Sequence, residues 1–292
     1  MTRGPAFGIT LATFGALVLT PDAMLMRLSG MEGFQMMGWR GLCMGTAMVA
    51  LWFAFSRTHR ADLRALVSGA GLLVVACQFF NAMLFCLGIA AAPVAVVLFG
   101  VASVPIFAAL FAWLLMGERT DLGTWITIGA VFTGIAIAVL GDGPIAGATT
   151  QAALWGAIAG LGVAAALALN FVVLRAQGQL PILLLIGVGA LCAGGVGFAT
   201  TGLAEMGQGQ IWVIALTGAL VLPLSFFCLS LAARYTPASN VSLLLLLETV
   251  LGPLWVWLVL GESITPAMGL GGAIVVGSLA LYLLNGRRRR RA

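Results

Sequence analysis

The stretch at residues 93–119, PVAVVLFGVASVPIFAALFAWLLMGER, returns in outline 144 residues later at residues 237–263, PASNVSLLLLLETVLGPLWVWLVLGES. Leucine matches carry little information in so apolar a chain, but a proline, a tryptophan and a Gly-Glu pair at one constant spacing do. The matched pairs are Pro93 with Pro237, Trp113 with Trp257, Gly117 with Gly261 and Glu118 with Glu262. This spacing predicts two copies of one structural unit, each about half of the 292 residues.

The composition is that of a protein dissolved in lipid. Hydrophobic residues make up 62% of the chain and charged residues 8%, whereas a soluble domain is about half apolar and a quarter charged. There are too few polar side chains to cover a surface that faces water. The sequence therefore predicts a polytopic membrane protein.

A bilayer core about 30 Å thick needs about 20 apolar residues per helix. Division of the chain at its charge and glycine clusters gives ten such segments, which predicts an all-α membrane protein with ten transmembrane helices. Five spans per half is an odd number, so the halves must be inverted five-helix repeats with a site between them. The expected parts are residues 1–146 (first repeat), 147–286 (second repeat) and 287–292 (basic cytoplasmic tail). The predicted spans are 5–27, 34–56, 65–89, 93–116, 122–141, 151–174, 181–203, 210–233, 237–260 and 266–285.

Arginine sets the expected orientation, because segments that stay in the cytoplasm are enriched in basic residues. All 14 basic residues are arginines. With both termini inside, the external loops hold only Arg27. The internal segments then hold Arg3, Arg57, Arg60, Arg64, Arg119, Arg175, Arg234 and the run from Arg287 to Arg291. We therefore expect both termini in the cytoplasm, and a tail that meets anionic headgroups rather than nucleic acid.

The two Gly-Glu segments resemble a known family. FAWLLMGERTDLGTWITIGAVFTGIAI and WVWLVLGESITPAMGLGGAIVVGSLAL are similar to the duplicated EamA unit of the drug/metabolite transporter superfamily, in which an apolar helix ends in Gly-Glu and a glycine-rich helix follows. The family often has an acidic residue in the middle of a helix in the second copy, here Glu248. It often has proline where this chain has Thr249. The overall pattern is most similar to bacterial aromatic amino-acid exporters of the YddG type, which implies an exporter in the bacterial inner membrane.

Polar side chains inside lipid-spanning helices are costly, so they are candidates for the substrate site. Glu248 lies near the middle of the ninth predicted span. Three roles are open for it: a proton site, an anchor for a substrate ammonium group, or a protonated residue that fixes helix packing. Gln78 and Asn81 share one helix face in the third span. They are candidates to bind a zwitterion, the alternative being interhelical hydrogen bonds worth about 1 kcal/mol. Ser242 is a weaker candidate, since helix packing explains it better than substrate binding does.

Two charged residues at similar depth are expected to pair. Arg40 enters the second predicted span by about 9 Å, at 1.5 Å per residue, and Asp22 lies at comparable depth in the first. An unpartnered charge there would be hard to hold, so we expect a structural pair or a gate latch. Trp39 and Trp155 are candidates to line an apolar pocket, although tryptophans near span ends more often anchor a helix at the interface.

The sequence favours transport over other classes of function. It contains no HExxH, Walker A or nucleophile motif in a suitable context, and its five cysteines lie in apolar spans without a CxxC pair. We therefore expect no enzyme activity, no cofactor, no metal and no nucleic-acid partner. The leading hypothesis is a monomeric inner-membrane exporter of aromatic and other neutral amino acids, working by alternating access. The alternative is an exporter of drugs or other small metabolites.

Overall fold

The chain is helical throughout the part that the structure describes. This computed structural model describes residues 5–117, 122–140, 150–236, 238–261 and 264–289, and no strand occurs among them. The matched residues Glu118 and Glu262 and the predicted repeat boundary at 146–147 lie outside these ranges. The first half contains α1 (Pro5–Leu19), α2 (Asp22–Leu28), α3 (Gly33–Phe55), α4 (His59–Leu66), α5 (Gly69–Ala91), α6 (Val94–Val101), α7 (Val104–Met116) and α8 (Leu122–Leu140).

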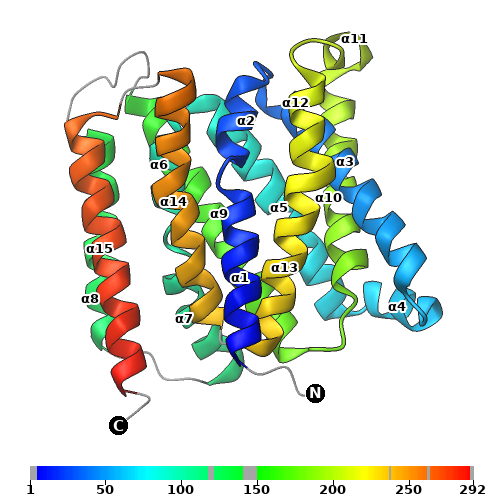
Figure 1. Ribbon diagram of the computed structural model, residues 1–292, viewed down its shortest axis with the longest axis horizontal. Helices are drawn as coiled ribbons and strands as arrows, with labels where there is room; N and C mark the ends of the chain where they lie inside the picture. Colours follow the sequence, from blue (N-terminus) through cyan, green and yellow to red (C-terminus); the bar gives the residue numbers. More distant parts are fainter. Residues whose placement is uncertain (1–4, 118–121, 141–149, 237, 262–263, 290–292) are drawn as a thin grey trace.

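The second half begins with α9, the longest helix of the described chain. It contains α9 (Thr150–Ala176), α10 (Ile182–Thr201), α11 (Leu203–Met206), α12 (Ile211–Leu216), a π-helical turn at Thr217–Val221, α13 (Leu222–Tyr235), α14 (Ala238–Leu260) and α15 (Pro266–Arg289). The long helices run side by side, and α1 begins at the same end of the bundle at which α15 ends (Figure 1). Helix α4 lies at that end, and α11 lies at the opposite end.

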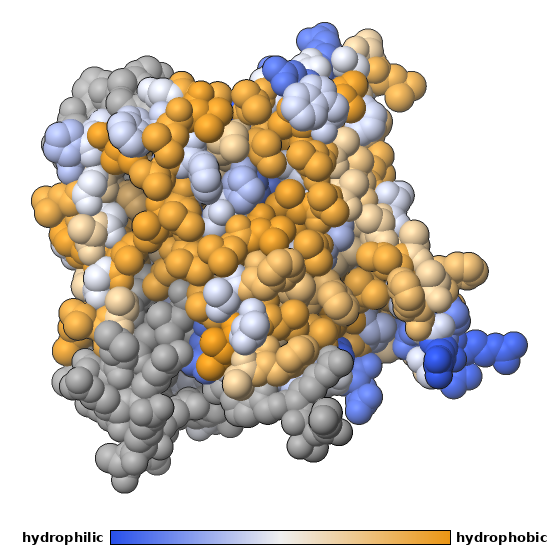
Figure 2. Space-filling view, in the orientation of Figure 1, coloured by the Kyte–Doolittle hydropathy of each residue, from blue (hydrophilic) through white to orange (hydrophobic). Residues whose placement is uncertain are grey.

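Seven helical segments of the described chain are long and apolar enough to cross a membrane. They are Ala6–Leu28, Gly69–Ala91, Val94–Leu115, Thr150–Ala176, Ile182–Thr201, Ile211–Tyr235 and Asn240–Leu260. Each coincides with a predicted span. Helices α3, α8 and α15 occupy the other three predicted spans and run alongside the seven (Figure 1). Apolar side chains cover the middle of the visible face, as expected for a surface that meets lipid (Figure 2).

The packing of the helices follows the duplication. Helix α3 packs on α10, and α8 packs on α15; in each pair the two helices hold the same place in their halves. Helix α5, the third span of the first half, packs on α9, the first span of the second half. In the same way α1, in the first span of the first half, packs on α13, in the third span of the second half. These are the contacts expected of two units related by an approximate twofold axis. Helices α7 and α14 end at the matched glycines Gly117 and Gly261.

Glycines allow the closest of these contacts. A Cβ atom added to Gly41 of α3 would lie 2.6 Å from the carbonyl oxygen of Ala190 in α10. One added to Gly134 of α8 would lie 2.7 Å from the carbonyl oxygen of Gly271 in α15. Real Cβ atoms do not approach so closely, so these backbones touch only because the side chains are absent. Such packing replaces the hydrophobic force that lipid cannot supply between helices.

Three predicted spans are interrupted or irregular. The first breaks at Thr20 and Pro21, between α1 and α2, and the fourth breaks at Ala102 and Ser103, between α6 and α7. The eighth contains the π-helical turn just before Pro223. Proline lacks the N–H that a continuous helix needs, and π-helical turns occur frequently at functional sites. The break at Pro21 determines where the charged residue Asp22 points.

The polar segment between the second and third predicted spans forms a helix of its own. Residues 59–66 form α4, and α5 begins only at Gly69 instead of residue 65. The reason is a cap: the Ser68 hydroxyl accepts a hydrogen bond of 3.1 Å from the backbone N–H of Gly71. That bond satisfies one of the free N–H groups at the start of α5.

Candidate substrate-binding site

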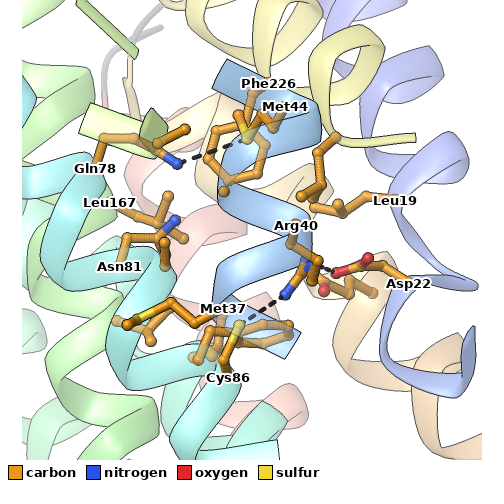
Figure 3. A pocket seen from close by; sticks show the side chains of 18 residues that line it. Leu19, Asp22, Met37, Arg40, Met44, Gln78, Asn81, Cys86, Leu167 and Phe226 are labelled. Carbon is orange, nitrogen blue, oxygen red and sulfur yellow. Dashed lines mark hydrogen bonds and ion pairs between the residues drawn. The ribbon is translucent and has the colours of Figure 1, made fainter. Parts of the chain in front are cut away.

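A cavity lies in the middle of the bundle, where helices of both halves meet. Its volume is about 40 Å³, room for about three water molecules. Helices α2, α3 and α5 supply Asp22, Arg40, Gln78 and Asn81, and α14 supplies Glu248. The other lining side chains are almost all apolar (Figure 3). The cavity therefore concentrates most of the charge found inside the spans.

The expected pair between Asp22 and Arg40 is present at this cavity. An Arg40 Nη atom donates a hydrogen bond of 2.5 Å to Asp22 Oδ2, and both side chains are almost fully buried. Asp22 is the first residue of α2, directly after the break at Pro21, so the break delivers the carboxylate to the cavity. The second oxygen, Asp22 Oδ1, is buried without a hydrogen bond among the described residues.

The other contacts of Arg40 are weak. Its second Nη atom donates to the sulfur of Met26 at 2.9 Å and to that of Cys86 at 3.5 Å, and its Cζ atom lies 5.5 Å from the ring centre of Phe85. Sulfur is a poor acceptor, and Arg40 Nε has no partner in the described part of the chain. A guanidinium group with five N–H donors is thus held in place while part of its capacity is unused.

Gln78 and Asn81 lie one turn apart on α5 and both line the cavity (Figure 3). Gln78 Nε2 lies 3.8 Å from the sulfur of Met44, a weak contact, and Gln78 Oε1 is buried without a described partner. The two side chains are 2% and 6% exposed. Amides that merely joined helices would bond to a neighbouring helix, so this arrangement favours the interpretation that they line a site.

Glu248 brings a second carboxyl group to the cavity from the other half of the protein. It is 4% exposed, and its side chain lines the same space as Asp22 and Arg40. Two carboxyl groups and one guanidinium group therefore share one buried space. If all three were ionised, the group would carry one unbalanced negative charge, which a proton or a cationic group of a ligand would neutralise.

Three other candidate residues lie elsewhere. Ser242 is buried but does not line the cavity. Trp39 donates its Nε1–H to the carbonyl oxygen of Met206 at 2.9 Å and packs edge-on against Phe198, near the α11 end of the bundle. Trp155 is 61% exposed on the outside of α9. The structure thus gives the two tryptophans packing and surface positions instead of a place in the pocket.

Some residues of the site gave no signal in the sequence. Met26 and Cys86 contact Arg40, but sulfur-containing residues in an apolar span are normally packing residues. Gly218, in the π-helical turn, brings the eighth span against Arg40. A Cβ atom there would lie 2.7 Å from Cys43 Cβ and 3.1 Å from Arg40 Cα.

Comparison with known proteins assigns this arrangement to a family. The sequence profile described as the EamA-like transporter family matches twice, at residues 5–140 and 154–284. The chain belongs to the EamA-like transporter family. The family resemblance predicted from the Gly-Glu segments is confirmed, and so is the presence of two EamA units. Family membership and the seven apolar helices make this EamA-like transporter a multi-pass membrane protein.

A solved structure supports the fold of this EamA-like transporter. That structure, described only as "Crystal structure of protein", is 19% identical and superposes with a TM-score of 0.66 over 96% of this chain and 98% of its own. Identity at that level shows a shared fold and nothing about substrate. No match was found among curated protein sequences.

Proposed function

We propose that this EamA-like transporter exports aromatic and other neutral amino acids across the bacterial inner membrane, by alternating access between two inverted five-helix repeats. The proposal includes ten transmembrane helices, cytoplasmic termini and a monomeric protein. One observation carries it: the cavity presents an incompletely satisfied guanidinium group and two carboxyl groups within an otherwise apolar lining. Export of drugs or other small metabolites is the second candidate, favoured by the apolar share of that lining.

The polar groups match the two ends of a zwitterion. Arg40, with Nε unpaired, can bind a carboxylate through charge-assisted hydrogen bonds. Glu248 and Asp22, with Oδ1 unpaired, can accept from an ammonium group. Gln78 Oε1 offers a further acceptor. Recognition of both ends would select α-amino acids over simple cations or anions.

The apolar lining suits an apolar side chain. Met37, Met44, Phe85 and Phe226 line the cavity beside the charged groups, and methionine repacks readily around ligands of different shape. A cavity with room for about three water molecules is too small for an aromatic amino acid, so the surrounding helices must separate to admit one. Such separation is what rocking of one repeat against the other provides.

Hydrogen bonds join the two halves at the α11 end of the bundle. Gln35 Nε2 of α3 donates to the carbonyl oxygens of Glu205 and Gln208, at 2.9 and 2.7 Å. The backbone N–H of Gln210 donates to the carbonyl oxygen of Ser29 at 2.8 Å. In the proposed orientation this end faces outward. The structure then corresponds to a state that is closed on the outside.

Proteoliposome counterflow tests the proposal. Vesicles loaded with unlabelled phenylalanine should accumulate labelled phenylalanine in a saturable way, and other neutral amino acids should compete. Gln78→Leu and Glu248→Gln should reduce the flux at least about tenfold, the value of one or two lost hydrogen bonds to a charged group. Gln177→Leu, which changes an exposed glutamine at the end of α9, should leave it unchanged. Absence of amino-acid flux, with flux of an apolar organic cation instead, would reject the amino-acid assignment and support the alternative.

A further inference from the structure

Helix α4 lies at the outer corner of one end of the bundle, between the end of α3 and the start of α5 in the chain (Figure 1). The carboxylate of Asp62 fixes it there by accepting three hydrogen bonds. The donors are Trp52 Nε1 at 2.8 Å, Ser56 Oγ at 2.6 Å and Thr58 Oγ1 at 3.2 Å. The His59 ring packs edge-on against Trp52, with 5.0 Å between the ring centres. The helix therefore has a defined position before any ligand arrives.

The only acidic residue of α4 is turned toward α3. Burial alone would raise the pKa of Asp62, but the hydrogen bonds from Ser56, Trp52 and Thr58 outweigh burial and hold that pKa below its usual value. Asp62 is thus ionised at neutral pH, with its oxygens occupied by these donors. It does not form an ion pair with the neighbouring arginines, which leaves their charge available to an external ligand.

The outward face of α4 combines arginines with apolar side chains. Arg60, Leu63, Arg64 and Val67 follow the i, i+3, i+4, i+7 pattern of one helix face. Leu63 and Val67 are 49% and 70% exposed, and Arg57 is exposed just before the helix. None of the three guanidinium groups forms an ion pair or hydrogen bond with a described residue. Arg60 and Arg64 on this face, with Arg57 just before the helix, therefore place three cations without a partner among the described residues next to apolar surface.

The neighbouring end of α3 extends the apolar part of this surface. Phe53 and Phe55 are 72% and 75% exposed. In Figure 2 the hydrophilic corner at the lower right of the protein, where α4 lies, adjoins hydrophobic side chains. A helix that carries arginines and large apolar groups together is typical of the boundary between headgroups and acyl chains. Arginine stems can lie along acyl chains while the guanidinium groups reach phosphate.

We propose that Arg57, Arg60 and Arg64, with Leu63 and Val67, form a binding site for an anionic phospholipid. The guanidinium groups bind the headgroup phosphate, and the two apolar side chains with Phe53 and Phe55 contact its acyl chains. A free phosphate ion would use only the arginines and would leave the apolar surface in water. The site is remote from the central cavity and does not depend on which substrate the cavity binds.

Quenching by brominated lipids tests this site at one position. The five native cysteines are replaced, and Val67→Cys is labelled with a small fluorophore in protein reconstituted in phosphatidylcholine vesicles. Brominated phosphatidylglycerol or brominated phosphatidylcholine is then added at equal mole fraction. We expect brominated phosphatidylglycerol to be preferred over brominated phosphatidylcholine at this position by at least about fivefold, which is the effect of one arginine that binds a headgroup. Equal quenching by the two lipids would overturn the proposal.

Two matched variants show whether the preference comes from this site. R57Q/R60Q/R64Q should abolish it, whereas R287Q/R288Q/R289Q, which removes three arginines from the C-terminal part of the chain, should keep it. If R57Q/R60Q/R64Q kept the preference for the anionic lipid, or if both variants lost it equally, a site on α4 would be contradicted. Circular dichroism of each variant checks that the helices are retained. Inorganic phosphate should reduce the preference no more than chloride at the same ionic strength does; a specific reduction would indicate an ion site instead.

Discussion

Gly117 and Gly261, 144 residues apart, end α7 and α14 in the same left-handed conformation, with φ at 70° in each. In both, the glycine N–H donates to the carbonyl oxygen of the tryptophan four residues earlier, at 2.9 Å for Trp113 and 3.1 Å for Trp257. Glycine is favoured there because it carries no Cβ atom to clash. The sequence repeat thus corresponds to a repeated backbone geometry, although the two helix ends lie on opposite sides of the bundle.

Replacement of either matched glycine by alanine should destabilise the protein. Gly117→Ala and Gly261→Ala should each cost about 1 kcal/mol, because a side chain in this conformation is strained, and lower the melting temperature in detergent by about 2–4 °C. Gly129→Ala is the matched control, since Gly129 lies within α8 with no neighbour to meet an added Cβ atom; it should leave the melting temperature unchanged or raise it. If Gly129→Ala lowered the melting temperature as much as Gly117→Ala and Gly261→Ala do, the special role of the two matched glycines would be contradicted.

The buried ion pair should show strong coupling in a double-mutant cycle. Arg40→Met leaves Asp22 with no ion-pair partner and should cost about 3–5 kcal/mol, and Asp22→Asn should also destabilise. The double variant should cost clearly less than the sum of the two single variants, because it leaves no unpaired charge at this pair. Thermal unfolding in detergent measures all four proteins. Simple additivity would mean that the contact contributes nothing specific.

Removal of the Gln35 side-chain amide should loosen the α11 end of the bundle. Gln35→Leu deletes hydrogen bonds to the carbonyl oxygens of Glu205 and Gln208, each worth about 0.5–1.5 kcal/mol. The closed state should lose about tenfold in relative population, the equivalent of about 1.4 kcal/mol. The rate at which an impermeant thiol reagent reaches Cys86 in the cavity from the α11 side should rise accordingly. Gln177→Leu is the control, and equal rates in both variants would show that Gln35 does not hold this end closed.

The corner at α4 should depend on pH through Asp62. Because the folded state holds the pKa of Asp62 below its ordinary value, the stabilisation is complete above the unfolded value of about 4 and is lost as pH falls through the folded value. A fluorophore on Val67→Cys should therefore become more mobile as pH drops below about 4, as measured by anisotropy. In Asp62→Asn it should be mobile at every pH. Identical pH profiles in the two proteins would contradict this role for Asp62.

Much of the architecture was predictable because lipid imposes simple rules. Long apolar segments must be helices, and a recurrent proline, tryptophan and Gly-Glu pair identified the two units from the sequence alone. The pairing of Asp22 with Arg40 could be predicted from their similar depth within the predicted spans, since an isolated charge is not stable at that depth. Gln78, Asn81 and Glu248 were recognised as candidates for the substrate site because polar groups are costly inside apolar spans. The structure brings all five residues to one cavity.

Other features depend on contacts that a single sequence does not reveal. A helix that is apolar all round gives no clue to which side faces lipid, so Trp155 could be placed in a pocket when it lies on the surface. Trp39 bonds to a carbonyl of Met206, which is 167 residues away. Helix α4 resembled a polar loop because its stability comes from the hydrogen bonds between Asp62 and the end of α3. Tertiary contacts decided each of these cases.

Cys86 shows whether the cavity binds substrate and opens to either side of the membrane. Its thiol lies beside Arg40 and is 1% exposed, so a reagent can reach it only when the cavity opens. A protein with Cys86 as its sole cysteine is placed in right-side-out and in inverted vesicles and treated with an impermeant thiol reagent. We predict reaction from both sides, slowed by phenylalanine in each case. Reaction from one side alone would contradict alternating access, and a rate that phenylalanine does not change would contradict binding of phenylalanine in the cavity.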